Sequence, residues 1–372
     1  MKNNFYSAVA TLIGAIVGVG IFGMPYVVAK AGFWTGIFFL FFLGGATLLL
    51  HLIYGEIVLR NQSRCRFVGY AENYLGLKGK VVASLVSVLM RYGALLAYMI
   101  VAGKFLSIIF NGTEFFWSLV FFGVGSVAIF FGLKVVSKIE VLMALFLLVV
   151  IGLIFIEGFY KIDYANLTNF NFDNFFLPYG VILWAIGGLP AIPEMKQILK
   201  GNTKSLKKAI VLATLIPLLL YAVFIFVVVG VTGPNTTVEA IEGLVQALER
   251  TVLLGAVFGF LAVSTSFLIL GVSLKKIFWY DYNLSPRFSW FLVCIIPLVC
   301  YLLEFRNFIA VISFTGAILT GLEGILLVRI YQKIKLKGLR NPEYKLKIPK
   351  FLEYTLIFVL LLGIIYQLVY YF

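Results

Sequence analysis

Long apolar runs recur along this chain from end to end, and short polar or glycine- and proline-containing breaks separate them. A helix of roughly 20 apolar residues crosses the hydrocarbon core of a bilayer, which is about 30 Å thick. Only 12% of the residues are charged, which is about half the share found in an average soluble domain. The sequence therefore predicts an all-α integral membrane protein without a soluble domain.

The breaks define eleven predicted transmembrane helices. Of the 30 Lys and Arg residues, 24 fall in loops on one side of this arrangement. Because basic loops remain in the cytoplasm, we expect a cytoplasmic N-terminus and a C-terminus outside the plasma (inner) membrane. The predicted helices are 7–31, 33–60, 80–109, 115–132, 140–158, 174–199, 206–232, 251–275, 288–303, 306–331 and 351–372.

The net charge of +14 comes mainly from these loops, so it indicates topology rather than a nucleic-acid partner. The lipid bilayer and a small solute are the expected partners, and no feature calls for an obligatory protein partner. The three cysteines have no metal-ligand spacing, and His51 is the single histidine. A membrane-embedded enzyme is therefore disfavoured, because its usual catalytic sets are missing.

The first apolar run contains the stretch GAIVGVGIFGMPY, residues 14–26, with four glycines and a proline. Both residue types weaken a helix. In lipid, irregular backbone persists only where it lines a cavity or is buried in protein. We expect helix 1 to be discontinuous here, and the alternative is a stripe of small residues that packs against a neighbouring helix.

The sixth predicted helix has a second weak point, in LPYGVILWAIGGLPAIPEM, residues 177–195. Two broken helices five apart are typical of two inverted repeats of five helices that meet at a midplane site. The predicted first repeat is 1–160 and the second is 161–335. A basic cytoplasmic loop and one extra helix, 336–372, follow them.

The chemistry of such a site follows from its bare backbone. Free N–H groups at a helix N-terminus bind a carboxylate, and free carbonyls bind an ammonium group or a small cation. Neither break contains a charged side chain. A zwitterionic amino acid therefore fits the predicted pair of breaks.

The eighth predicted helix contains FLAVSTSFLILGVSL, residues 260–274, with adjacent hydroxyls at 264–266. Two readings remain open. The hydroxyls could close onto carbonyls of the preceding turn, as is common in membrane helices. Alternatively, two of them could join carbonyls of helix 1 to bind sodium, a hard cation that prefers oxygen ligands.

These motifs carry a family resemblance. GAIVGVGIFGMPYVVAKAG, together with YGALLAYMIVAGKFL of helix 3, resembles the amino acid/auxin permease family. STSFLILGVSLKKIFWYDYN is similar to the aromatic amino acid permeases. Both belong to the amino acid–polyamine–organocation superfamily with the leucine-transporter fold. The resemblance implies secondary transport of neutral amino acids by alternating access, driven by sodium or protons.

The resemblance also implies roles for particular residues. The substrate carboxylate would meet N–H groups of the first break, and its amino group would meet carbonyls of the second, where two glycines permit the unwound turn. A sodium ion, the sole expected cofactor, would lie between helices 1 and 8. The substrate positions are Gly18, Val19, Gly20, Ile21, Ala185, Ile186, Gly187 and Gly188, and the sodium positions are Gly14, Val17, Ala262, Thr265 and Ser266. From their place on these helices, Phe22, Tyr98 and Trp184 are candidates for the pocket wall.

Ionisable residues within apolar helices are costly and mark candidate functional sites. Glu56, Arg91 and Glu194 are candidates for gating or proton coupling. The alternative for Glu56 is an ion pair with Arg60 one turn away. For Arg91, pairing with Glu194 or Glu56 is one expectation, and snorkelling of the side chain toward the membrane surface is the alternative. His51 is expected to be packed and hydrogen-bonded, with titration near neutral pH as the alternative.

Together these features predict a symporter of neutral amino acids, with large apolar or aromatic side chains favoured. The alternative is an ion channel or a metal-ion permease on the same scaffold. A channel would need a continuous polar path, which few of the predicted helices show. A metal-ion permease would need Asp, Asn or Met ligands at the breaks, where Met24 stands without a carboxylate.

Overall fold

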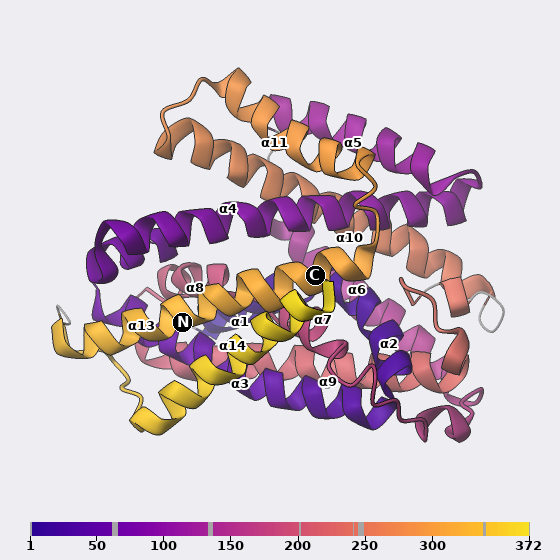
Figure 1. Ribbon diagram of the computed structural model, residues 1–372, viewed down its shortest axis with the longest axis horizontal. Helices are drawn as coiled ribbons and strands as arrows, with labels where there is room; N and C mark the ends of the chain where they lie inside the picture. The colour runs from indigo at the N-terminus through magenta and orange to yellow at the C-terminus, as the bar shows by residue number, and fades with distance from the viewer. Residues whose placement is uncertain are drawn as a thin grey trace.

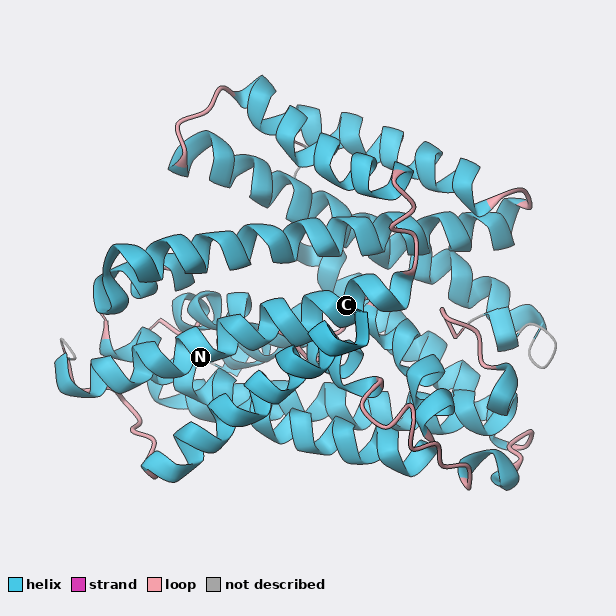
Figure 2. Cartoon of the chain, viewed as in Figure 1, coloured by secondary structure: helices cyan, strands magenta, loops and turns pink. Residues whose placement is uncertain are grey.

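The computed structural model describes residues 2–61, 66–132, 137–200, 202–240, 242–244, 249–337 and 340–371. All regular structure within these ranges is helical (Figure 2). The α-helices are α1 Lys2–Ile16, α2 Gly20–Ala31, α3 Phe33–Arg60, α4 Phe67–Phe110, α5 Glu114–Phe131, α6 Ser137–Phe159, α7 Pro178–Ala185, α8 Ile192–Ile198, α9 Leu206–Thr232, α10 Glu249–Lys276, α11 Pro286–Leu302, α12 Phe308–Phe314, α13 Gly321–Lys337 and α14 Lys350–Tyr371. The 3₁₀ turns are η1 Tyr164–Leu167, η2 Leu189–Ala191, η3 Thr203–Ser205, η4 Gly233–Asn235 and η5 Glu242–Leu244, and the π-helical turns are η6 Ile277–Asp281 and η7 Thr315–Thr320.

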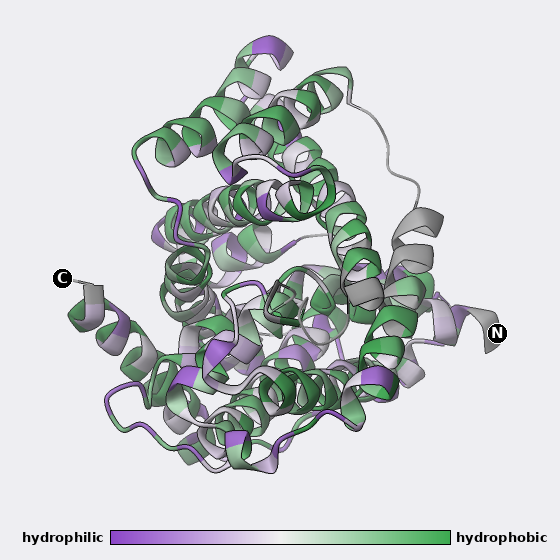
Figure 3. Cartoon of the chain, turned by 90° about the vertical axis from the view of Figure 1, so that its right-hand side faces the viewer, coloured by the Kyte–Doolittle hydropathy of each residue, from purple (hydrophilic) through white to green (hydrophobic). Residues whose placement is uncertain are grey.

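Each of the eleven predicted spans contains helix, but the helices differ in length. Seven in the described ranges are long and apolar enough to cross a membrane, or eight if the bent pair α1 and α2 forms one span. The shorter remainder are α11, the described apolar part of α6 at Val149–Phe159, and the broken α7 and α8. Apolar residues cover most of the helices, whereas hydrophilic residues gather at loops and helix ends (Figure 3). This is the architecture of an integral membrane protein.

Helix α4 begins well before the predicted start at residue 80. It runs from Phe67 through a kink at Gly76, where φ is +74°. Glycine tolerates this left-handed backbone because it has no Cβ. The added segment is amphipathic, since Tyr70 and Ala71 are buried while Glu72 is exposed. Its apolar face is therefore covered by protein, and the ring of Tyr70 packs edge-on against Tyr54 of α3.

The helices form two packed groups (Figure 1). In one group α4 packs against α5, α10 and α11. In the other group α9 packs against α1, α2 and α3, while α7 contacts α2 and α3 and α8 contacts α1 and α3. The α12–η7–α13 segment contacts both α4 and α7, and α14 lies along α13. The two broken helices thus lie together in one group.

Candidate functional site

The first break separates α1 from α2. Residues 17–19 are not helical, and the two helices are bent by 53°. The Val17 amide closes α1 by donating to the Ile13 carbonyl at 2.7 Å, and the Phe22 amide donates to Val19 at 3.1 Å. The break lies within the glycine-rich stretch from which it was predicted.

The second break separates α7 from α8. Helix α7 ends at Ala185, and the Ile186 amide donates to the Ile182 carbonyl at 3.0 Å. Gly187 and Gly188 follow without helical structure, and η2 contains Pro190. Proline lacks the N–H that a continuous α-helix would need at this point. Glycine and proline therefore act together to end one helix and to start the next.

The two breaks pack directly against each other. A Cβ built on Gly20 would lie 2.7 Å from the Cα and Cβ of Ala185, and one built on Gly188 would lie 2.8 Å from Ile16 Cγ1. Such contacts are too short for any side chain, so the glycines permit the approach. In contrast, a Cβ on Gly14 or Gly18 would meet nothing within 4 Å. These two glycines therefore do not form the close-packed stripe that was the alternative to a break.

Tyr221 of α9 connects the breaks. Its side chain is fully buried, and its hydroxyl donates to the Ile16 carbonyl at 2.8 Å and lies 3.2 Å from the Ala185 carbonyl. These carbonyls end α1 and α7, so each has lost its helical N–H partner. Tyr221 was not predicted from the sequence. The one local feature that could have drawn attention to this part of α9 is Pro217, a helix-weakening residue one turn before Tyr221.

The aromatic candidates divide into two sets. Tyr98 and Trp184 have ring centroids 6.5 Å apart, and Trp184 also lies against Gly20. Phe22 instead packs edge-on against Phe105 and Phe224, at centroid distances of 5.2 and 6.4 Å. Tyr98 and Trp184 therefore flank the breaks, whereas Phe22 packs between α4 and α9.

The remaining predicted substrate positions lie at the breaks. Val19, Ile21 and Ile186 are buried, while Gly18 and Gly187 are half-buried. The structure contains both kinds of backbone group that the sequence predicted. These are the N-terminus of α2 and the carbonyls at the ends of α1 and α7, which have no helical N–H partner. These groups can bind opposite ends of a zwitterion.

The predicted sodium ligands are not assembled in this structure. The Thr265 hydroxyl donates to the Ala262 carbonyl at 2.9 Å, so two of the expected ligands bind each other within α10. Ser266 interacts instead with the Tyr98 hydroxyl. Helix α10 packs mainly against α4 and α6, while α1, which carries Gly14, packs mainly against α9 and α8. Val17 lies in the first break. Local hydrogen bonding within α10 explains the difference, because a membrane hydroxyl readily donates to the preceding turn.

Glu56, the first gating candidate, is fully buried and has several partners. Its carboxylate lies 2.7 Å from Arg60 Nη2 and accepts the Leu346 amide at 2.7 Å. The Tyr331 hydroxyl lies at 3.4 Å. In addition, the Tyr344 hydroxyl donates to the Leu52 carbonyl at 2.7 Å. The expected pair with Arg60 is present, and Glu56 also fixes the segment between α13 and α14 to α3.

The other two gating candidates do not pair as expected. Glu194 lies 3.8 Å from Arg66, and both side chains are more than half exposed. Arg91 Nη1 donates to the Ser87 carbonyl at 2.6 Å. Glu323 of α13, a helix that packs along α4, is a carboxylate whose charge acts on Arg91. The expectation that Arg91 pairs with Glu194 or Glu56 is therefore wrong for this structure.

His51 has the packed environment that was expected. Its Nδ1 lies 3.0 Å from the Thr214 hydroxyl, which donates its own proton to the Ile210 carbonyl at 2.9 Å. The Thr214 oxygen must therefore accept from Nδ1–H, which leaves Nε2 as a buried acceptor without a partner. Elsewhere, Lys104 pairs with Glu114 at 2.5 Å.

Comparison with known proteins gives the family. The sequence pattern of the tryptophan/tyrosine permease family matches residues 1–370. The chain belongs to the tryptophan/tyrosine permease family. This finding agrees with the resemblance to aromatic amino acid permeases and corrects the resemblance to amino acid/auxin permeases, whose short glycine motif in helix 1 is not specific enough to identify a family.

This permease also resembles individual transporters over nearly their whole length. It is 24% identical to glutamine transporter 2 of Aliivibrio fischeri, with 86% of each chain covered. It is 24% identical to tyrosine-specific transport system 1 of Haemophilus influenzae, covering 98% of this chain and 95% of the relative. Tyrosine-specific transport system 2 of the same organism is likewise 24% identical, with coverages of 99% and 96%. The permease is therefore a transporter and not an enzyme.

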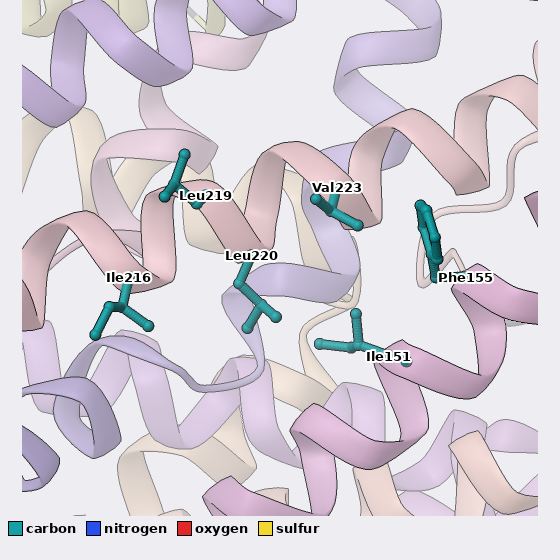
Figure 4. A pocket seen from close by; sticks show the side chains of 7 residues that line it. Ile151, Phe155, Ile216, Leu219, Leu220 and Val223 are labelled. Atoms are coloured by element: carbon teal, nitrogen blue, oxygen red, sulfur yellow. The ribbon is translucent and has the colours of Figure 1, made fainter.

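Two apolar recesses on the permease lie away from the breaks. The first, about 400 Å³ in volume, lies between α6 and α9 and is lined by aliphatic side chains and Phe155 (Figure 4). The second lies between α5 and α11 and includes Trp290 and Cys294. Among the described residues, no group of three or more His, Cys, Asp or Glu side chains could hold a metal ion. The breaks are therefore the candidate site.

Proposed function

We propose that this permease is a secondary active transporter that moves neutral amino acids across the plasma membrane by alternating access. The observation that carries the proposal is the direct contact between the two broken helices, with Gly20 against Ala185. In such transporters the substrate binds where discontinuous helices meet. The relatives are transporters named for tyrosine and glutamine, both neutral amino acids, and they give no support to a channel.

In the proposed complex the carboxylate binds the N–H groups of residues 18–21, at the positive end of the α2 dipole. The ammonium group binds carbonyls of residues 185 and 186, where Gly187 and Gly188 leave the backbone free of the helix. Tyr98 and Trp184 form part of the wall around the side chain. Their aromatic surfaces and the names of two relatives support a large aromatic substrate such as tyrosine.

The proposed architecture is a pair of five-helix inverted repeats followed by one extra helix, eleven spans in all. The packing supports this arrangement, because spans 3 and 4 lie with spans 8 and 9, while spans 1 and 2 lie with spans 6 and 7. Each group thus joins members that are five apart in sequence. The basic loops support a cytoplasmic N-terminus and a C-terminus outside.

We propose symport coupled to a sodium or proton gradient. Sodium binding between spans 1 and 8 would require α1 to approach α10 and the Thr265 hydroxyl to leave the Ala262 carbonyl. Proton coupling would instead use an ionisable group in the membrane. Glu56, Arg91 and Glu194 are the candidates for that role or for gating.

Uptake by the purified permease in proteoliposomes tests the function. Radiolabelled tyrosine, tryptophan, glutamine and lysine are supplied under a sodium gradient and then under a proton gradient. We expect saturable uptake of a neutral amino acid under one gradient. Uptake of none of them, or an ionic current without substrate, would contradict the proposal.

A further inference from the structure

The hydroxyl of Tyr221 occupies a position that a substrate group would be expected to take. It contacts the last carbonyl of α1 and the last carbonyl of α7, at 2.8 and 3.2 Å. Both carbonyls stand at the negative ends of helix dipoles and lack helical partners. A tyrosine from a third helix therefore satisfies acceptors that two separate breaks have exposed.

We propose that the Tyr221 hydroxyl is a placeholder for the primary ammonium group of the substrate, and that binding of the amino acid displaces it. This inference rests on the proposed function and names the group that closes the site when no substrate is bound. It differs from a simple contact role, in which the hydroxyl would stay in place and bind the substrate directly.

The donor chemistry favours displacement. A phenol has one proton, which it must share between the Ile16 and Ala185 carbonyls. An ammonium group has three donors and a full positive charge, so it can donate to the Ile16 and Ala185 carbonyls at once, beside the Ile186 carbonyl of the proposed complex, and can also interact with both dipoles. Neither break supplies a charged side chain that would hold the ammonium elsewhere. The substrate group is therefore the stronger ligand for the same two acceptors.

An empty site would be unfavourable without the placeholder. Tyr221 is fully buried, as are Ile16 and Ala185, and a buried carbonyl without a donor destabilises its conformation. The hydroxyl removes this penalty while the transporter returns without substrate. Pro217, one turn before Tyr221, removes an intrahelical hydrogen bond of α9 and gives the helix a place to bend as the side chain moves.

The test compares Tyr221→Phe with the matched control Tyr179→Phe. Tyr179 is also buried and donates its hydroxyl to a single carbonyl, that of Val359 at 3.0 Å, away from the breaks. Removing a competing hydrogen bond should tighten equilibrium binding of radiolabelled L-tyrosine about two- to tenfold in Tyr221→Phe. Affinity should stay unchanged in Tyr179→Phe. Unchanged or weaker binding by Tyr221→Phe would overturn the placeholder role.

A transport measurement separates the return of the empty transporter from the steps that carry bound substrate. Because the empty site of Tyr221→Phe has unpaired carbonyls, its net uptake of tyrosine should fall while exchange of internal for external tyrosine is retained. Equal loss of both would contradict the inference. If the wild-type protein binds no amino acid at all, the proposed function fails, whereas normal wild-type binding with an unaltered variant rejects the placeholder alone.

A second variant keeps the test decisive if Tyr221→Phe does not fold. Replacing Tyr221 by 3-fluorotyrosine changes little in volume but makes the phenol a stronger donor. The improved competitor should weaken tyrosine binding, opposite to the effect of phenylalanine. A change in the same direction as Tyr221→Phe would reject the proposal even if that variant proved unstable.

Discussion

Two buried polar regions of this permease satisfy their hydrogen bonds in different ways. At the breaks, the Ile16 and Ala185 carbonyls share one neutral hydroxyl. At the Arg60 end of α3, the carboxylate of Glu56 has a cationic partner and also accepts a backbone amide of the 340–349 segment. The first arrangement can be exchanged for a ligand. The second is paired by charge and would be costly to open, so a gating role for Glu56 would require these contacts to break.

The largest expected effect is at the breaks. Gly20→Leu should abolish tyrosine uptake, because its Cβ would lie 2.7 Å from the Ala185 backbone. Uptake and equilibrium binding in proteoliposomes measure the loss. Gly45→Leu on α3 is the control, since a Cβ there meets nothing within 4 Å. Normal affinity in Gly20→Leu would mean that the contact between the breaks is not part of the site.

The next effect concerns the Glu56 region. Glu56→Leu should lower the free energy of unfolding by roughly 3–5 kcal/mol, because it leaves Arg60 without its buried partner. Denaturant unfolding in detergent measures this change. Glu72→Leu breaks an exposed pair with Lys80 and should cost at most about 1 kcal/mol. If the Glu56 variant were as stable as the wild type but inactive in transport, Glu56 would have a role in gating or proton coupling rather than in stability.

A neutral buried pair should have an intermediate effect. Thr214→Val leaves the Nδ1–H of His51 without an acceptor, which should cost about 1–3 kcal/mol of stability. The control is Thr355→Val, because Thr355 is partly exposed and donates only to its own helix. Similar melting temperatures for the two variants would show that the His51 contact contributes little.

The smallest effect is a pH dependence of the 340–349 segment. Burial opposes ionisation of Glu343, but hydrogen bonds from Thr203 and Arg340 outweigh it and leave the pKa of Glu343 below its ordinary value. A lowered folded-state pKa stabilises above the unfolded pKa, and that stability is lost as pH falls through the folded value. The free energy of unfolding in detergent should therefore fall as the Glu343 carboxyl becomes protonated, by less than about 1 kcal/mol because the group is partly exposed. Glu343→Gln should remove this pH dependence, and a variant that kept it would assign the titration to another group.

The sequence predicted those parts of the molecule that depend on local chemistry. Apolar runs identified the helical stretches, and the glycines and prolines of 14–26 and 177–195 located both breaks, because these residues act on the backbone where they stand. The early start of α4 was missed, since its first turns are amphipathic rather than apolar.

The contacts between distant helices could not be predicted. The role of Tyr221 depends on how α9 is rotated against α1 and α7, and a tyrosine in an apolar helix has no distinctive local pattern. Likewise, the charge of Glu323, which is distant in sequence, acts on Arg91 because α13 packs along α4. The sodium site at Thr265 stays a prediction, because in this structure its hydroxyl donates to a carbonyl three residues earlier in the same helix, which was the local alternative.

The lack of charged side chains at the breaks has an electrical consequence. A potential of 100 mV does about 2.3 kcal/mol of work on each elementary charge that crosses the membrane. The broken segments 17–19 and 186–191 contain no such charge, so in the proposed alternating-access cycle the field would do no work on side-chain charges there. Under the proposed function, a voltage dependence contributed by this region would come from the charge of the bound solute and of a coupling ion.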